Sequence, residues 1–390
     1  MVYLDYNATT PCDPRVVEAM EPFLKERFYN PSSLYTGARE NKKAIETARE
    51  KLALLLDCQP EEVFFTSGGT EADNWAIKTA AWTLKEKGNH IITSSIEHHA
   101  VLHTCGFLEK QGFQISYLPV DSSGLVDLEA LKKAIKKETI LVSIMHANNE
   151  IGTIQPLQEI SLLLKEKGIL FHTDAVQTVG KIPVSVKKLG VDMLSLSAHK
   201  FYGPKGVGAL YVRKGVKLGS FIHGGQQERS RRAGTENVPG MVGLGKAAEL
   251  AVREMPEEER RVRILRDRLE NQLQQRIPDL VFNGHREKRL YNTASVCVKY
   301  VEGESMLLHL DFEGICASSG SACTSGSLEP SHVLLAIGLP HEVAHGSLRF
   351  SLGKYSTEEE VEKLIQTLPG IVEKLRFLSP FGKSSPEKGR

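Results

Sequence analysis

The chain has little that would take it to a membrane or to nucleic acid. No apolar run approaches the ~20 residues of a membrane-spanning helix, and the first residues, MVYLDYNATTP, lack the basic and apolar parts of a secretory leader. Charge of one sign is not in excess, because 49 Lys and Arg stand against 48 Asp and Glu, a formal net charge of +1. We therefore expect no direct nucleic-acid partner and no membrane association, but a soluble cytoplasmic protein that binds small molecules or other proteins.

Cysteines are few and scattered. They form no CxxC pair and are not dense enough for a disulfide framework. We expect reduced thiols and no metal site, with one thiol free for chemistry. The six cysteines are Cys12, Cys58, Cys105, Cys297, Cys316 and Cys323.

The pattern of the chain predicts its fold class. At 390 residues it is too long for one small core, so we expect one large domain and a smaller partner. Between about residues 60 and 215, β-rich runs such as HIITSS, TILVSIMH and DMLSLSA alternate with helical patterns. This alternation predicts an α/β fold with a mainly parallel sheet covered by helices. The expected division is a large domain over 16–255, a small domain over 1–15 and 256–380, and a frayed tail over 381–390.

Side chains able to hold a cofactor follow three of these strands, where ligands of open α/β sheets bind. A lysine that loses its proton through desolvation can form an imine with the aldehyde of pyridoxal phosphate, which also needs an acid opposite its pyridine nitrogen. Lys200 and Asp174 suit these roles, although singly they could be a turn lysine and a helix N-cap. The candidates at the strand ends are His98, His99, Asp174, Gln177, Ser197, His199 and Lys200.

Two glycine-containing segments predict anion binding. The segment 64–74, FFTSGGTEADN, runs from a strand into a helix, so free backbone N–H groups near Gly69 and Thr70 would face an anion. It fits neither GxxxxGK[ST] nor GxGxxG, so a nucleotide-binding fold is not supported. In the segment 219–237, three arginines beside Thr235 could bind phosphate or carboxylate oxygens, or could form a solvated basic loop.

One cysteine lies in a segment of small residues. Within 315–327, ICASSGSACTSGS, Cys323 is surrounded by Ser, Gly and Ala, whereas Cys316 lies beside apolar residues and is expected to be structural. A run of small residues packs poorly into a core, so Cys323 is expected to be exposed and able to act as a thiolate nucleophile. The alternative is an incidental thiol in a surface loop.

Taken in order, these segments resemble the cysteine desulfurases, which are pyridoxal-phosphate enzymes of aminotransferase class V. The resemblance implies fold type I: a mainly parallel seven-stranded sheet between helices, plus a smaller α+β domain. A cysteine loop at about 315–330 resembles the NifS/IscS class. The similar segments, which cover nearly the whole chain, are YLDYNATTP, SGGTEADN, EHHAVL, MHANNEIGTIQP, DAVQ, SAHKFYGPKG, RAGTEN, SSGSACTS and SLRFSLG.

The resemblance also implies a role for each candidate residue. Lys200 would hold the cofactor, and Asp174 would pair with its pyridine nitrogen. His98, rather than His99, would stack on the ring and take part in proton transfer, and Gln177 would donate to the phenolic oxygen. The phosphate would be held by Gly69, Thr70, Ser197 and His199, with Thr235 from the second subunit of a homodimer, and the substrate carboxylate by Asn149 and Arg349.

The implied reaction converts L-cysteine to L-alanine and places the sulfur on Cys323 as a persulfide. The sulfur would then pass to an acceptor protein, such as an iron–sulfur scaffold or a tRNA-thiolation relay. Alternatives on the same fold are a selenocysteine lyase and an aminotransferase, which would not need Cys323. A non-catalytic sulfur carrier or assembly subunit is a further alternative, against which the retention of Lys200, Asp174 and His98 argues.

Overall fold

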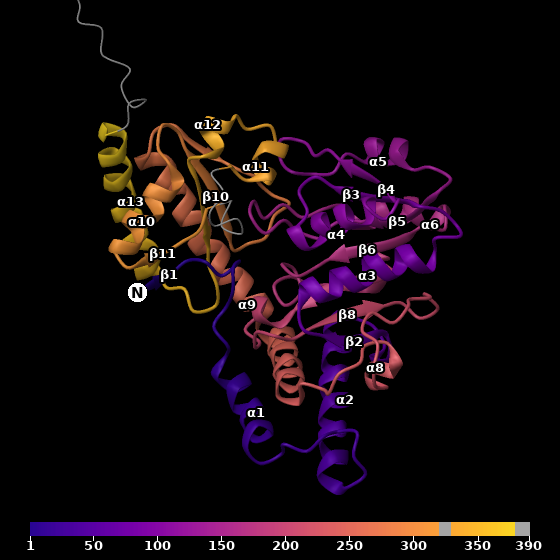
Figure 1. The fold of residues 1–390 in the computed structure, drawn as a ribbon. Helices are drawn as coiled ribbons and strands as arrows, with labels where there is room; N and C mark the ends of the chain where they lie inside the picture. The colour runs from indigo at the N-terminus through magenta and orange to yellow at the C-terminus, as the bar shows by residue number, and fades with distance from the viewer. Residues whose placement is uncertain (320–328, 379–390) are drawn as a thin grey trace, which may run out of the picture.

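A computed structural model describes residues 1–319 and 329–378 of the chain. Its centre is a seven-stranded sheet with the order β2-β8-β7-β6-β5-β3-β4, in which β8 runs antiparallel to its two neighbours and the remaining pairs are parallel (Figure 1). The predicted α/β fold with a mainly parallel sheet is confirmed. The strands are β2 Val63–Thr66, β3 His90–Ser94, β4 Gln114–Leu118, β5 Thr139–Ser143, β6 Leu170–Asp174, β7 Met193–Ser197 and β8 Gly208–Val212.

Helices cover both faces of this sheet (Figure 1). Helices α3 and α4 bury Trp75 and Leu108 against one face. Helices α2 and α9 bury Leu52 and Leu244 against the other. Because both faces are covered, side chains on both faces of the inner strands are buried, including polar ones such as His172 and Ser195. The helices are α1 Pro14–Lys25, α2 Thr36–Leu56, α3 Gly69–Thr83, α4 His99–Glu109, α5 Leu128–Ala134, α6 Leu157–Glu166, α7 Val186–Leu189, α8 Gln227–Ser230 and α9 Val238–Arg276.

The C-terminal part forms a second core. An antiparallel sheet of order β12-β10-β9 packs with the later turns of α9 and with α10 and α13. The first residues belong to this part, because β1 pairs with β11. The expected boundary at 255/256 lies inside the continuous helix α9, and the domain division itself stays a prediction. The elements are β1 Val2–Tyr3, β9 Leu280–Phe282, β10 Thr293–Val298, α10 Gly303–Phe312, β11 Ile315–Cys316, α11 His332–Ala336, α12 His341–Ala344, β12 Ser347–Ser351 and α13 Glu358–Leu378.

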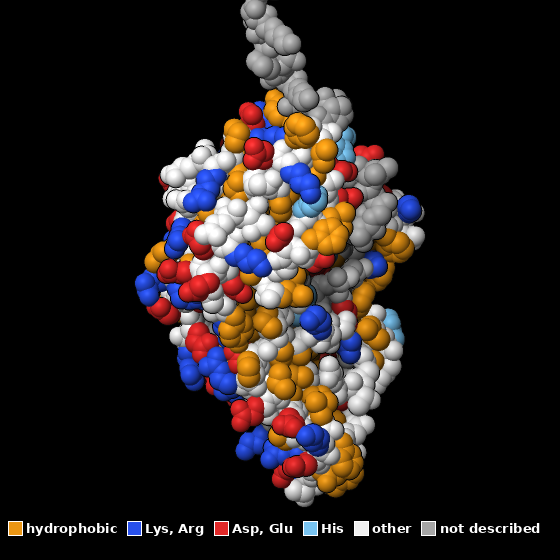
Figure 2. Space-filling model, turned by 90° about the vertical axis from the view of Figure 1, so that its left-hand side faces the viewer, with side chains coloured by type: hydrophobic (Ala, Val, Ile, Leu, Met, Phe, Trp, Pro, Cys, Tyr) orange, Lys and Arg blue, Asp and Glu red, His pale blue; other side chains and the backbone are white. Residues whose placement is uncertain are grey.

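The surface carries both signs of charge close together. Figure 2 shows the face beside α13, α10 and α1, where acidic and basic side chains alternate and hydrophobic side chains gather toward the end of the molecule that holds α1. Over residues 1–319 and 329–378, no helix is long and apolar enough to cross a membrane.

Candidate functional site

A cavity of about 440 Å³ lies at the carboxyl edge of the central sheet. Strands β6 and β7 are parallel neighbours, so the residues that end them meet at this edge. The cavity also reaches β12 of the second core. The predicted residues that line it are Gly69, Thr70, His98, Asn149, Asp174, Gln177, Ser197, His199, Lys200 and Arg349.

Lys200 is brought to the cavity by a short turn. Strand β7 ends at Ser197 and is followed by a 3-10 helix, Ala198–Lys200. The ammonium of Lys200 donates hydrogen bonds to the backbone carbonyl oxygens of Asn7 at 2.6 Å and Ala8 at 2.8 Å. The N-terminal segment therefore forms the wall that holds this amine in the cavity.

Two carboxyl groups lie at the buried side of the cavity. Asp174 ends β6, accepts a hydrogen bond from the backbone N–H of Val176 at 2.9 Å, and has its pKa raised to about 6 by burial. Asp73, on α3, was not predicted; burial and the nearby Asp174 raise its pKa well above the usual range. Its Oδ1 has no hydrogen-bond partner among the described residues. Such a pair favours a ligand that brings a positive charge or a proton to this wall.

Lys181, which the sequence did not single out, fixes the orientation of Gln177. The buried ammonium of Lys181 donates to Gln177 Oε1 at 2.9 Å and to Asn7 Oδ1 at 3.3 Å. Because the backbone carbonyl of Asn7 can only accept, the amide oxygen of Gln177 faces Lys181 and its NH₂ group faces Asn7. That group donates to the backbone carbonyl of Asn7 at 3.0 Å. The donor role that the resemblance implies for Gln177 stays a prediction.

His98 is a neutral imidazole at the cavity wall. It precedes α4, and its Nδ1 accepts a hydrogen bond from the backbone N–H of Ala100 at 3.1 Å, so the ring proton is on Nε2. Burial, followed by the positive charge of Lys200, lowers its pKa to about 4. His98 lines the cavity, whereas His99 is not among the lining residues. The catalytic role expected of His98 stays a prediction.

The start of α3 forms the expected anion cradle. The first N–H groups of a helix have no intrahelical partner and face outward, and here they belong to the turn that begins at Gly69. Gly68 has a φ of 155°. A Cβ at Gly69 would lie 2.5 Å from Val176 Cγ2, so the close packing of this turn requires glycine. Thr70, Ser197 and His199 line the same cavity and complete a polar site suited to a phosphate.

Arg349 lies across the cavity from the sheet, on β12. Its Nη2 donates to Asp5 Oδ1 at 2.7 Å and its Nη1 to the backbone carbonyl of Asn149 at 3.1 Å. Its Nε is buried and has no hydrogen-bond partner among the described residues. A guanidinium has five N–H donors, so this arginine retains capacity for a ligand carboxylate.

Some predicted residues are not brought into this cavity. Cys323 lies outside the described residues. Thr235 is exposed in the loop before α9 and does not line the cavity of its own chain. The arginines near it are already engaged: Arg232 pairs with Glu71 at 2.8 Å, and Arg229 lies over the ring of Phe64. Arg232 thus already has an anionic partner in this chain, and the anion-binding role of the three arginines stays a prediction.

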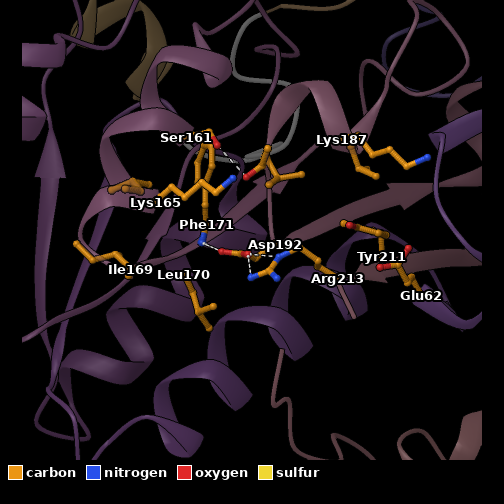
Figure 3. Close-up of a pocket in the computed structure, with 15 residues that line it drawn as sticks. Glu62, Ser161, Lys165, Ile169, Leu170, Phe171, Lys187, Asp192, Tyr211 and Arg213 are labelled. Atoms are coloured by element: carbon orange, nitrogen blue, oxygen red, sulfur yellow. Dashed lines mark hydrogen bonds and ion pairs between the residues drawn. The ribbon is translucent and has the colours of Figure 1, made fainter. Parts of the chain in front are cut away.

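A second cavity, of about 480 Å³, lies at the opposite end of the sheet, beside the start of β6 and the end of β8. Figure 3 shows the residues that line it. Several of its charged side chains form ion pairs or hydrogen bonds with other residues of the chain. Asp192 accepts from Arg213 Nε at 2.7 Å and from the backbone N–H of Phe171 at 2.8 Å, and Lys187 pairs with Asp57. No group of His, Cys, Asp and Glu in the described parts of the chain is arranged to hold a metal ion. The cavity that holds Lys200 is therefore the better candidate for chemistry.

Comparisons with known proteins agree on one family. Residues 2–364 match Aminotransferase class-V. The chain is 60% identical over 380 residues to the cysteine desulfurase IscS of Dictyoglomus turgidum, covering 97% of this chain and 96% of that protein. A solved NifS-like protein has a TM-score of 0.91 and 45% identity over 96% of this chain and 100% of its own. The structure of SspA in complex with cysteine has a TM-score of 0.82 and 40% identity over 92% of this chain and 100% of its own.

Proposed function

Because the chain belongs to the aminotransferase class-V family, we propose that it is a pyridoxal-phosphate-dependent cysteine desulfurase that converts L-cysteine to L-alanine. The observation that carries the proposal is the meeting of Lys200, Asp174 and Arg349 in one cavity. An amine, a buried acid and a guanidinium match the cofactor aldehyde, the cofactor ring nitrogen and an amino-acid carboxylate respectively. The relatives named as cysteine desulfurases and the solved complex with cysteine support the same substrate.

The cavity has residues suited to the aldehyde, the ring nitrogen and the phosphate of the cofactor. When bound, pyridoxal phosphate supplies an electron sink for the pair released at the substrate α-carbon. Lys200 would bind its aldehyde carbon, and the carboxyl pair of Asp174 and Asp73 would hold a proton on its ring nitrogen. The turn at Gly69, with Thr70, would hold the phosphate.

The remaining residues would position the substrate and move its protons. Arg349 and Asn149 would hold the carboxylate, and the amine of Lys200, which lines the same cavity, would move a proton at the substrate α-carbon. His98 is neutral above about pH 5, because its pKa is about 4, and can therefore accept a proton or pass one on. Gln177, held by Lys181, would donate to the phenolic oxygen.

Cys323 is the proposed acceptor of sulfur. Its thiolate would attack the substrate sulfur, the carbon–sulfur bond would break with its electron pair retained on carbon, and the enzyme would carry the sulfur as Cys–S–SH. A persulfide can then be passed to a second thiol, and the resemblance to the cysteine desulfurases implies an acceptor in iron–sulfur assembly or tRNA thiolation. The assignment of Cys323 rests on the segment SSGSACTS and its resemblance to the cysteine desulfurases.

We further propose that the chain acts as a homodimer. Large apolar side chains are exposed on and after α1: Leu24 is 64% exposed, Phe28 72% and Leu34 89%. Soluble monomers rarely leave such a cluster uncovered, and a second copy of the chain would bury it. Sedimentation of the parent protein and of Leu34→Glu tests this, since a parent that remains monomeric at working concentrations would contradict the proposal.

The experiment that tests the function measures alanine and sulfide released from L-cysteine in the presence of dithiothreitol. Cys323→Ser should bind cysteine yet release little alanine, because a hydroxyl is a far weaker nucleophile than a thiolate and cannot hold a persulfide. Cys316→Ser is the matched control in the same segment. If the protein were an aminotransferase, Cys323→Ser would leave its turnover unchanged.

Mass spectrometry after brief exposure to L-cysteine without reductant provides the second readout. One added sulfur should appear on the peptide that contains Cys323 and should be removed by dithiothreitol. Sulfur on Cys316 or Cys297 instead, or wild-type alanine release by Cys323→Ser, would show that the mechanism is wrong.

A further inference from the structure

The guanidinium of Arg349 has a carboxylate partner within the chain. Asp5 Oδ1 lies 2.7 Å from Arg349 Nη2, and both side chains line the cavity that contains Lys200. Arg349 is nearly buried, with its side chain 5% exposed, and Asp5 is 18% exposed. A ligand carboxylate bound by Arg349 would therefore be the second anion on the same guanidinium.

The backbone fixes Asp5 beside Arg349. Asp5 forms a parallel bridge with Ser351, two residues beyond Arg349 on β12. On either side of Asp5, the backbone N–H of Ser351 donates to the carbonyl of Leu4 at 2.8 Å, and that of Tyr6 donates to the carbonyl of Ser351 at 3.1 Å. Main-chain hydrogen bonds thus hold the backbone of Asp5 beside β12, and from there its carboxylate reaches Arg349.

Three donors of Arg349 remain for a ligand. The Nη2–Asp5 and Nη1–Asn149 hydrogen bonds use two of the five N–H groups and fix the plane of the guanidinium. A side chain already held in its binding geometry loses less conformational freedom when the ligand arrives. Asp5 also supplies a counter-ion, since an unpaired buried cation is unfavourable.

We propose that Asp5 is a positioning residue that holds Arg349 in the orientation required for the carboxylate of the amino-acid substrate. The inference rests on the proposed function in one respect, namely that Arg349 binds this carboxylate. The part of Asp5 that matters for positioning is its oxygen acceptor, and its negative charge moderates the affinity for a second anion.

The test compares Asp5→Ala with Asp5→Asn in the cofactor-loaded protein. The probes are L-alanine, which has the carboxylate, and L-alaninamide, which lacks it; each is titrated by calorimetry. Asp5→Ala removes the anchor and should raise the Kd of L-alanine about 10-fold or more, the scale of one charge-assisted hydrogen bond. The Kd of L-alaninamide should change much less.

Asp5→Asn keeps an oxygen at the same position and should bind L-alanine within about fivefold of the parent, or more tightly, because the repelling charge is gone. With L-cysteine, the loss in Asp5→Ala should fall on KM more than on kcat. Asp267 is the matched control, since its Oδ1 also lies 2.7 Å from an arginine, Arg266, away from the cavity. Asp267→Ala and Asp267→Asn should bind both probes as the parent does.

Three results would overturn the inference: unchanged L-alanine binding by Asp5→Ala, equal weakening of both probes, or weakening by Asp5→Asn as large as that by Asp5→Ala. If Asp5→Ala does not fold, Asp5→Asn decides alone, because a loss of tenfold or more there contradicts the role of the oxygen. A parent that binds L-alanine in an Asp5-dependent way but releases no sulfide would refute the proposed function and leave this inference standing. If the parent releases sulfide while Asp5→Ala binds L-alanine normally, this inference is refuted and the proposed function stands.

Discussion

Replacement of Lys181 by Met should change how the stability of the chain depends on pH. Burial, and then the charge of Lys200, lower the pKa of Lys181 from 10.5 to about 7. The unfolded chain keeps this proton up to about pH 10, whereas the folded chain releases it near pH 7. Stability therefore rises with pH across this window, because the unfolded state binds more protons.

The magnitude follows from the two pKa values. One pKa unit corresponds to about 1.4 kcal/mol, so a charged Lys181 in the folded chain costs about 5 kcal/mol relative to an ordinary lysine. Between pH 6 and pH 9 this lysine should add about 2.5 kcal/mol to the free energy of unfolding. Lys181→Met removes that contribution, and it also leaves Gln177 Oε1 without its donor, at a cost of about 1 to 3 kcal/mol.

The assay is urea unfolding of the cofactor-free parent and variant at several pH values from 6 to 9. The difference in free energy of unfolding should move in favour of the parent by about 2.5 kcal/mol over this range, since other titrating groups cancel in the comparison. Lys188→Met changes an exposed lysine on α7. Its free energy of unfolding should depend on pH in the same way as that of the parent. A Lys181→Met curve that also runs parallel to the parent would refute the assignment of Lys181 as a lysine with a lowered pKa.

Three further predictions follow from the site and from one turn. Lys200→Ala should lose the visible absorbance of the bound cofactor and turnover together while far-ultraviolet circular dichroism is unchanged; retained absorbance and rate would exclude Lys200 as the attachment point. Asp174→Asn should lower turnover by about 100-fold or more while cofactor content, measured by release in alkali, falls much less; near-normal alanine production would contradict the role of its charge. Ser230→Gly should raise the free energy of unfolding by up to about 1 kcal/mol, because Ser230 has a φ of 63°; a clear loss of stability in thermal unfolding would show that this conformation carries no strain.

Most of the predicted residues that line the cavity follow strands or begin helices. Asp174 ends a buried strand and Lys200 follows one within three residues, and the edge they share follows from the parallel arrangement of β6 and β7. The turn at Gly69 could be predicted because glycine and a helix start are visible locally. In each case the signal lies within about ten residues, and the fold class then supplies the relative position.

The residues that sequence reasoning missed owe their roles to distant contacts. Asp5 meets a side chain 344 positions away, and no local pattern distinguishes it from an exposed acid. Asp73 lies on α3 and acquires its raised pKa from burial and from Asp174 on another element. For Lys181 a weak signal exists, because its neighbours in VGKIPV are apolar and could have indicated a buried ammonium.

The N-terminal segment links the two cores at the cavity itself. Asn7 accepts from Lys200 and Gln177 through its backbone carbonyl, and its Nδ2 donates to Thr293 Oγ1 at 2.8 Å and to the carbonyl of Asn149 at 3.1 Å. One buried residue thus contacts the amine proposed to hold the cofactor and the strand β10 that pairs with the strand of Arg349. Because the polar groups of Asn7 are engaged, a shift of Asn7 would displace hydrogen-bond partners on both sides of the cavity. A short segment near the start of the chain therefore links the amine of Lys200 to the strands that carry Arg349, beside the apolar cluster that Ile96, Met145 and Ile151 form with Cys297, Val333 and Leu334.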